Sequence, residues 1–357
     1  MIGRRQFLFR SSMLIAGVLL FFFTFRNINI ATTLTLISDV GYLCIVIFSF
    51  YFVGCIFDSL AWQQLLPTSQ SISFIRIVLI HIAGESFYRF LPAGVVVGES
   101  VKVMLMAKHT SVPTPHIVSS LLMRKVFLGL AQALYIGVVV LAGITIGSSR
   151  SDSILTQTGL TVSFLLLIVF LTIGYFLAKG NLGSVSYRLL MRLPFRAVQT
   201  MLYRTKKTFF ETDIVVKNAI VRNSTTNIAA ILFFFCGWLT ELAETYCILF
   251  LLGAKVSFQD VMIFEPVVSF LRSVVFFIPA GLGVMDIGYS ASLQSAVPGM
   301  TMTIAAAFII IKRAKELFWI IIGVSVATVL GRIQFTNKRF HSHPQNLTDI
   351  APAQTQP

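Results

Sequence analysis

The chain has 357 residues, of which 56% are hydrophobic and 12% are charged. A soluble domain carries about 25% charged residues, so this composition excludes an ordinary soluble fold. The formal net charge is +14, from 28 Lys and Arg against 14 Asp and Glu. The basic residues lie between apolar runs, where they set membrane orientation and contact anionic headgroups. We therefore expect a polytopic membrane protein with no nucleic-acid partner.

Apolar runs predict membrane helices over residues 10–26, 36–57, 126–147, 158–178 and 228–252. Backbone polar groups find no partner in hydrocarbon outside their own segment, which favours helices, and the runs lack the alternation of a membrane barrel. Residues 71–107 and 256–331 are also apolar, but charges and Pro-Gly breaks interrupt them. The predicted fold is all-α, with about six to eight transmembrane helices in one integral membrane domain over 1–331.

The positive-inside rule predicts the orientation. The N-terminus is basic, and residues 179–222 carry nine Lys and Arg against two acids, so both are expected in the cytoplasm. The tail 332–357 opens with basic residues and then becomes polar, which predicts a disordered cytoplasmic segment. Counting crossings between these anchors places both ends of 71–125 in the cytoplasm. Region 256–331 then begins outside and ends inside.

A short motif occurs once in each interrupted region. The first copy runs from Phe90 through Pro92 and Ala93 to Gly94, and the second runs from Phe277 to Gly281. Proline and glycine disfavour a continuing helix, so each copy should break a helix in two. The predicted helix breaks are Pro92, Gly94, Pro279, Gly281 and Gly283.

The crossing count gives the two breaks opposite orientations. Such an inverted repeat, here about 36–147 and 228–331, is how many transporters build a binding site at the membrane midplane. An acid follows each motif, Glu99 after the first and Asp286 after the second. The alternatives are a chance match and two proline kinks in ordinary helices.

Charged residues recur inside the apolar regions, where each costs at least ~2.5 kcal/mol at the bilayer centre. Such groups should therefore face one another or water. Helical spacing favours pairing of Glu85 with Arg89, Glu99 with Lys102, and Lys312 with Glu316. The acids in question are Asp58, Glu85, Glu99, Glu241, Glu244, Asp260, Glu265, Asp286 and Glu316, and the bases are Arg89, Lys102, Arg124, Lys125, Arg272, Lys312, Arg313 and Lys315.

Near the two breaks we expect bases to outnumber acids, and a buried surplus of positive charge favours a bound anion. Half-helix N-termini after each break would add free N–H groups. The anion is most simply a lipid phosphate, although a small anionic solute would also fit. Arg272 either holds it together with Arg89 or neutralises a buried acid such as Glu265. The candidate lipid- or anion-binding residues are Arg89, Glu99, Lys102, Arg272, Asp286 and Arg313.

Motifs of soluble enzymes are absent from the sequence. It contains no phosphate-binding G-x-x-x-x-G-K-[ST], no H-E-x-x-H and no G-x-S-x-G. The five histidines and four cysteines show no ligand spacing. We expect no metal, no cofactor and no catalytic residue.

At its two breaks the chain resembles the lysylphosphatidylglycerol synthase transmembrane family, also called flippase-like membrane proteins. The family's first Pro-Gly break is followed by Gly-Glu and a basic residue, here Glu99 and Lys102, with lysine where arginine is commoner. Its second turn, Pro-x-Gly-x-Gly, precedes an acid, here Asp286 in place of the usual glutamate. A late arginine with a tryptophan beyond it corresponds to Arg313 and Trp319.

The resemblance covers nearly the whole chain, and the segment Asp58-Ser59-Leu60-Ala61-Trp62 favours the hopanoid-biosynthesis-associated branch. It implies a protein of the bacterial inner membrane that moves or presents a polar lipid between leaflets. Anionic membrane lipids are the implied ligands, and lipid-biosynthesis enzymes are candidate partners. The lysyl-lipid synthases carry a soluble aminoacyl-transferase domain after the membrane part. We expect none here, because the sequence ends shortly after its last apolar region.

Three functional classes remain open. A lipid flippase is the first, and the protein would then not be an enzyme. An intramembrane enzyme acting on lipid-linked substrates, with Glu99 or Asp286 as its base, is the second. An ion-coupled transporter of small anions is the third, and a structural partner in a biosynthetic complex is a further alternative.

Overall fold

The computed structural model describes residues 30–67, 72–91, 94–146, 154–180, 210–220, 224–275, 281–297 and 299–332, with a few single residues between them. The described residues are almost entirely helical and include no strand. The predicted helix 10–26, most of the basic stretch 179–222, the tail 333–357 and the prolines Pro92 and Pro279 lie outside the described residues. The helices run in the order α2 (Ile30–Val40), the 3-10 turn η1 (Gly41–Leu43), α3 (Cys44–Leu65), α4 (Phe74–Phe90), α5 (Gly94–His109), α6 (Thr114–Ile146), α7 (Ile154–Ala178), α10 (Ser224–Leu251), α11 (Phe258–Val274), α12 (Val284–Ala296) and α13 (Met302–Arg332).

Five of these segments are long and apolar enough to cross a membrane: Ala31–Leu65, Thr114–Ile146, Ile154–Ala178, Ser224–Leu251 and Met302–Arg332. The prediction of an all-helical, multi-pass membrane protein is confirmed. The predicted helix 126–147 is part of a longer helix, α6, that begins at Thr114. The two interrupted regions contain the shorter helices α4, α5, α11 and α12 together with α13.

At the first break the chain turns back on itself, so that α4 and α5 form an antiparallel hairpin. A Cβ on Gly94 would lie 1.8 Å from the Tyr88 carbonyl oxygen, and one on Gly98 would lie 2.6 Å from the Gly84 carbonyl oxygen. Glycine is therefore required at both positions for the two backbones to approach this closely. The predicted break at Gly94 coincides with the first residue of α5.

The second break likewise joins two antiparallel helices, α11 and α12. Gly281 and Gly283 have φ angles of +62° and +79°, a region that favours glycine. The Leu271 side chain of α11 lies over Gly288 of α12. The chain reverses direction at each break, whereas a proline kink would continue along one axis.

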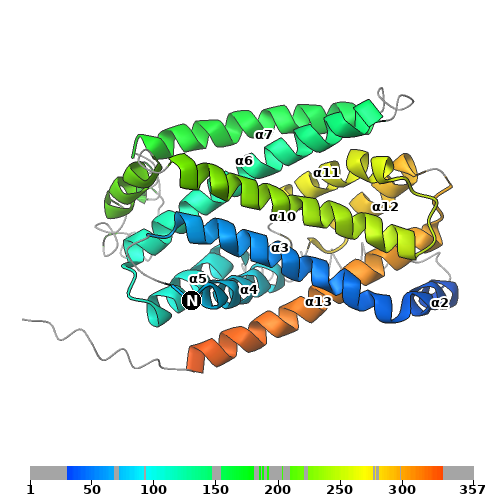
Figure 1. The fold of residues 1–357 in the computed structure, drawn as a ribbon, viewed down its shortest axis with the longest axis horizontal. Coiled ribbons are helices and arrows are strands. Elements are labelled where there is room, and N and C mark those ends of the chain that lie inside the picture. The colour runs from blue at the N-terminus through cyan, green and yellow to red at the C-terminus, as the bar shows by residue number, and fades with distance from the viewer. Residues whose placement is uncertain are drawn as a thin grey trace, which may run out of the picture.

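Helix α13 shows how the two hairpins face each other. Arg313 binds Asp286 of the second hairpin, whereas Glu316, three residues further on, contacts Arg89 at the tip of the first. Toward its end, the Leu330 carbonyl accepts a hydrogen bond from His109 at the base of the first hairpin. The hairpins thus meet tip to tip halfway along α13, and their open ends point in opposite directions (Figure 1).

Other long helices also contact the opposite half of the chain. The Gln132 amide of α6 donates to the Ser269 carbonyl of α11 at 3.1 Å, so α6 lies along the second hairpin as α13 lies along the first. Helices α3 and α10 lie side by side (Figure 1), where a Cβ on Gly54 would meet Thr240 at 3.1 Å. Helices of the first half of the chain (α3, α6) therefore pack against helices of the second half (α10, α11) around the hairpin tips.

Candidate functional site

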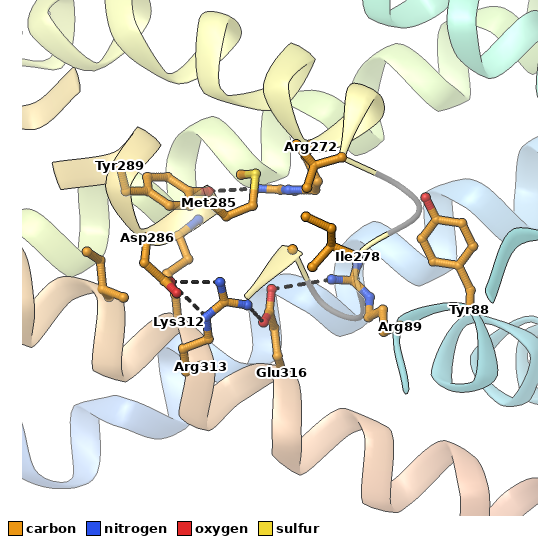
Figure 2. Close-up of a pocket in the computed structure, with 13 residues that line it drawn as sticks. Tyr88, Arg89, Arg272, Ile278, Met285, Asp286, Tyr289, Lys312, Arg313 and Glu316 are labelled. Carbon is orange, nitrogen blue, oxygen red and sulfur yellow. Dashed lines mark hydrogen bonds and ion pairs between the residues drawn. The ribbon is translucent and has the colours of Figure 1, made fainter. Parts of the chain in front are cut away.

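A cavity of about 540 Å³ lies between α3, α4, α6, α7, α10 and α11. This volume is in the range of small-molecule binding sites. A smaller cavity of about 60 Å³ lies next to it, between the hairpin tips and α13 (Figure 2). Tyr88, Arg89 and Arg272 line both cavities. Arg89 and Arg272 therefore lie at the same two cavities, which is the arrangement that one of the two alternatives for Arg272 requires.

The two arginines occupy similar places on the two hairpins. Arg89 is in the last turn of α4 and Arg272 is in the last turn of α11. Positive charge is favourable there, because the final carbonyl groups of a helix give that end a partial negative charge. The guanidinium of Arg89 also lies 5.1 Å from the centre of the Tyr51 ring.

Around the first hairpin, the charged groups form one network. Lys102 Nζ lies 2.8 Å from Glu85 Oε1, and Lys125 Nζ lies 2.7 Å from Glu99 Oε1. Arg124, almost completely buried, lies within 3.6 Å of three carboxylates. This first network consists of Asp58, Glu85 and Glu99 with Lys102, Arg124 and Lys125, and the imidazole of His81 lies 3.5 Å from Asp58 Oδ2.

At the second hairpin, Asp286 has two partners. Its Oδ1 accepts hydrogen bonds from Arg313 Nε at 2.9 Å and Nη2 at 2.7 Å (Figure 2). Its Oδ2 accepts from the Gly283 backbone N–H at 2.9 Å, which caps the N-terminus of α12. The sequence predicted free N–H groups at this helix N-terminus. The Gly283 N–H is not free, because it donates to the carboxylate of Asp286 in the same helix.

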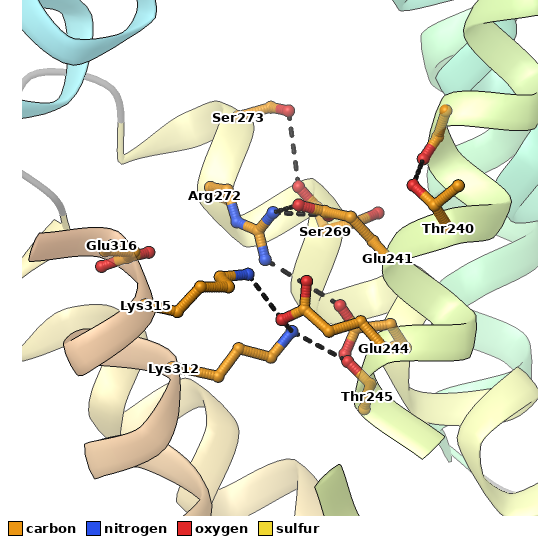
Figure 3. Close-up of polar contacts among 12 residues, drawn as sticks. Thr240, Glu241, Glu244, Thr245, Ser269, Arg272, Ser273, Lys312, Lys315 and Glu316 are labelled. Atoms are coloured by element: carbon orange, nitrogen blue, oxygen red, sulfur yellow. Dashed lines mark hydrogen bonds and ion pairs between the residues drawn. The ribbon is translucent and has the colours of Figure 1, made fainter. Parts of the chain in front are cut away.

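The charges continue from α13 toward α10 and α11. Arg272 binds both carboxylate oxygens of Glu241 and donates to the Tyr289 hydroxyl at 2.6 Å. Lys312 lies 3.2 Å from Glu244, to which Lys315 also donates (Figure 3). Three neighbouring groups of ion pairs make up what we call the second network: Arg89, Glu316, Arg313 and Asp286; Arg272, Glu241 and Glu265; and Lys312, Lys315 and Glu244.

Residues 11–324 match the family described as the lysylphosphatidylglycerol synthase TM region. The chain belongs to this family. No curated protein and no solved structure matches it. Membership supports a membrane protein with a lipid-related function, and the resemblance noted at the two breaks is confirmed.

The charge balance differs from what the sequence suggested for this family member. Counting Lys and Arg as the bases, the first network holds three carboxylates and three bases, and the second holds five of each. The expected surplus of bases is therefore not found when all these groups are ionised. A bound anion needs a further source of positive charge or must displace a carboxylate.

Of the predicted helical-face pairs, only one is observed among the described residues. Glu99 and Lys102 lie 3.4 Å apart. Glu85 pairs instead with Lys102 and Arg124, and Lys312 pairs with Glu244. Glu265, named as a possible partner of Arg272 in one of the two alternatives, is 3.9 Å away, whereas Glu241 is in direct contact. Interhelical contacts displace the local pairs because the facing helices bring opposite charges closer.

The six predicted site residues divide between the two networks. Glu99 and Lys102 belong to the first, and Arg89, Arg272, Asp286 and Arg313 belong to the second. Four groups of the larger cavity were not among the predicted site residues: Tyr88, Gln132, Trp238 and Glu241, the last of which the sequence indicated only as an acid in an apolar run. A carboxylate in the middle of the apolar run 228–252 was the available signal for Glu241.

Proposed function

We propose that this protein binds the phosphate headgroup of an anionic lipid between its two hairpin tips and moves that lipid between leaflets. The observation that carries the proposal is the convergence of Arg89 and Arg272, from oppositely directed hairpins, on the same cavities. Their side chains are 19% and 25% exposed, so both retain access to the cavity.

Arg89 supports the proposal because its donors are not fully used. Its ion-pair contact among the described residues is Glu316 at 3.6 Å, and its buried Nε has no hydrogen-bond partner there. A guanidinium matches the oxygens of a phosphate with two parallel N–H donors. A headgroup at this position would complete the hydrogen bonding of Arg89.

The walls of the larger cavity favour a lipid over a free anion. Phe170, Phe234 and Trp238 line it together with apolar residues. Val169 of α7 and Val274 of α11 also line it, and they are 49% and 47% exposed on the molecule. The cavity therefore adjoins surface that acyl chains can cover, with the charged groups deeper inside.

The hairpins suit a binding site inside the bilayer. Their helices have 13 to 17 residues, fewer than the ~20 that span the hydrocarbon core. We propose that the hairpins enter from opposite sides as an inverted repeat, with both chain termini in the cytoplasm of a bacterial inner membrane. Access from the two leaflets could then alternate around one fixed site.

The other functional classes have less support. A small-anion transporter would use the same arginines but would not need the apolar wall. An enzyme would need a carboxylate available as base, whereas Asp286 already accepts three hydrogen bonds and Glu99 contacts three bases. A non-enzymatic lipid carrier is the function that we propose.

The test uses the full chain in proteoliposomes containing fluorescent phosphatidylglycerol. We expect wild-type protein to move this lipid between leaflets, and Arg89→Gln and Arg272→Gln to slow that movement at least tenfold. Loss of one charge-assisted contact weakens binding by about 1.5–3 kcal/mol. Arg76→Gln is the matched control, because Arg76 lies at the base of the first hairpin, where it donates to the His109 carbonyl.

A second arm separates a lipid from a free anion. Glycerophosphoglycerol carries the same phosphodiester without acyl chains. Uptake of this solute without movement of the lipid would establish small-anion transport in place of the proposed function. Turnover of phosphatidylglycerol into a new product by the purified protein would instead establish an enzyme.

A further inference from the structure

Among the described residues, Glu265 is the one carboxylate of the two networks that accepts no hydrogen bond. It is fully buried in the middle of α11, and neither of its oxygens has a partner within hydrogen-bond distance there, the Thr245 hydroxyl being a more distant neighbour that accepts from Lys312. The nearest basic atom is Arg272 Nη2, at 3.9 Å. Burying an ionised carboxylate without such partners is costly, and protonation removes the charge. Glu265 is therefore placed to hold a proton.

The groups around Glu265 do not neutralise it. Its two basic neighbours have closer carboxylates, since Arg272 binds Glu241 and Lys312 lies 3.2 Å from Glu244. Helix α7 carries no Asp, Glu, Lys, Arg or His. The titratable and polar groups that interact with Glu265 are Arg272 of α11, Tyr135 of α6, Glu241 and Thr245 of α10, Tyr289 of α12 and Lys312 of α13.

The charge count of the second network depends on this proton. With Glu265 ionised, five carboxylates face five bases. With Glu265 protonated, four carboxylates face five bases, and one positive charge is left over. Arg272 keeps Glu241 as its partner, whereas Lys312 and Lys315 share the single carboxylate Glu244. Lys312 lines the smaller cavity together with Arg89 and Arg272, so the surplus charge lies where a ligand can reach it. One phosphodiester anion restores neutrality.

We propose that Glu265 is a proton-binding site and that its protonation is coupled to binding of a phosphate headgroup at Arg89 and Arg272. This inference rests on the proposed function and adds its regulation. One proton from cavity water adds to a Glu265 carboxylate oxygen as one phosphodiester anion binds, and both are released together. The site is thus electrically balanced when it is empty and when it holds both. A pH gradient across the membrane would then drive movement of the lipid from one leaflet to the other.

Binding measurements on the purified full chain in detergent test the coupling. The probe is phosphatidylglycerol, whose phosphodiester keeps its charge between about pH 5 and pH 9. Above the Glu265 transition, one coupled proton makes the wild-type affinity fall about tenfold for each pH unit. A pH indicator in weak buffer should record one proton taken up per lipid bound. Above that transition, wild-type binding without proton uptake overturns the proposal, and so does affinity that is constant with pH.

The Glu265→Gln variant mimics the protonated state. We expect it to bind phosphatidylglycerol at every pH with the low-pH affinity of the wild type, and to take up no proton. Asp260→Asn is the matched control, since it makes the same kind of change on α11 in an N-terminal cap at a distance from the cavity. It should keep the wild-type pH slope. Wild-type slope and uptake in Glu265→Gln would overturn the assignment to Glu265.

A readout that needs no lipid separates this proposal from the proposed function. Infrared difference spectra between low and high pH should show a carboxylic-acid band in wild type and Asp260→Asn that is missing in Glu265→Gln. If phosphatidylglycerol binds to none of the proteins, the proposed function fails, but this band still establishes Glu265 as a proton site. The same band in all three proteins, or in none, overturns that site.

Discussion

The two hairpins share a tip motif and a downstream acid, yet the acid serves a different purpose in each. In both copies the acid follows the proline by seven residues. Helix α5 begins at Gly94, so Glu99 lies in its second turn, whereas α12 begins at Val284 and Asp286 lies in its first turn. Asp286 can therefore cap its own helix, and Glu99 cannot. A repeated sequence does not guarantee a repeated contact, because the start of the helix decides which groups the acid reaches.

The largest expected effect concerns the orientation of the two hairpins. Ser111 and Lys255, both exposed, lie at the base of the first and second hairpin. If the hairpins enter from opposite sides, a cysteine at Ser111 should react with an impermeant thiol reagent only from the cytoplasm, and one at Lys255 only from outside. The measurement uses a background in which Cys44, Cys55, Cys236 and Cys247 are replaced. Labelling of both positions from the same side would remove the inverted repeat.

The close approach in the first hairpin should tolerate no side chain. Gly98→Leu would place atoms within 2.6 Å of the Gly84 carbonyl oxygen, and we expect it to destabilise the protein by at least about 3 kcal/mol. Thermal unfolding in detergent, together with the yield of monodisperse protein, measures the loss. Gly331→Leu is the matched control, because a Cβ there meets nothing within 4 Å. Equal stability of the two variants would contradict the close contact between α4 and α5.

The two acids should differ in their contribution to stability. Asp286→Asn removes a fully buried charge that faces Arg313, which keeps Glu316 as a partner, and we expect this to cost about 1.5–3 kcal/mol. Glu99→Gln should cost only about 1–2 kcal/mol, because Lys102 and Arg124 keep Glu85 as a partner. Thermal unfolding of the two variants compares them directly. A larger loss for Glu99→Gln would show that helix position does not determine the role of the acid.

Both substitutions should nevertheless impair lipid movement. Each acid fixes bases that surround the cavities, so we expect Glu99→Gln and Asp286→Asn to abolish transport in proteoliposomes while the protein still inserts. Protein amount in the membrane is the control measurement. Wild-type transport by both variants would make the two acids incidental to function.

The smallest effect is expected at the second break. Gly281 has a positive φ, and the atoms nearest to a Cβ there belong to the flexible Met285 side chain. Gly281→Ala should therefore cost about 1–2 kcal/mol, well below the Gly98 substitution. Thermal unfolding measures it, and a loss as large as that of Gly98→Leu would show that the second hairpin is as closely packed as the first.

Composition and local chemistry were sufficient for the fold class and for the breaks. The glycines at 94, 281 and 283 mark where helices begin or where φ is positive, which are properties of the residues themselves. The ion pairs were not predictable in the same way. Arg272 and Glu241 are 31 residues apart and meet only because α10 packs beside α11. The charge balance around the cavities could not be predicted either, because a list of charged residues does not show which of them lie close together.

The glycines of the first hairpin also affect which parts of the molecule can move. Helix α4 touches α5 through Gly84 and Gly98, and it touches α13 through Ser86, whose Oγ lies where a Cβ of Gly323 would be. Helices joined through such small residues have little side-chain material between them that could deform, so α4, α5 and α13 should move as one stiff body. The second hairpin instead turns through two glycines of positive φ. We expect the hinge of any access change to lie there, with the first hairpin as its fixed frame.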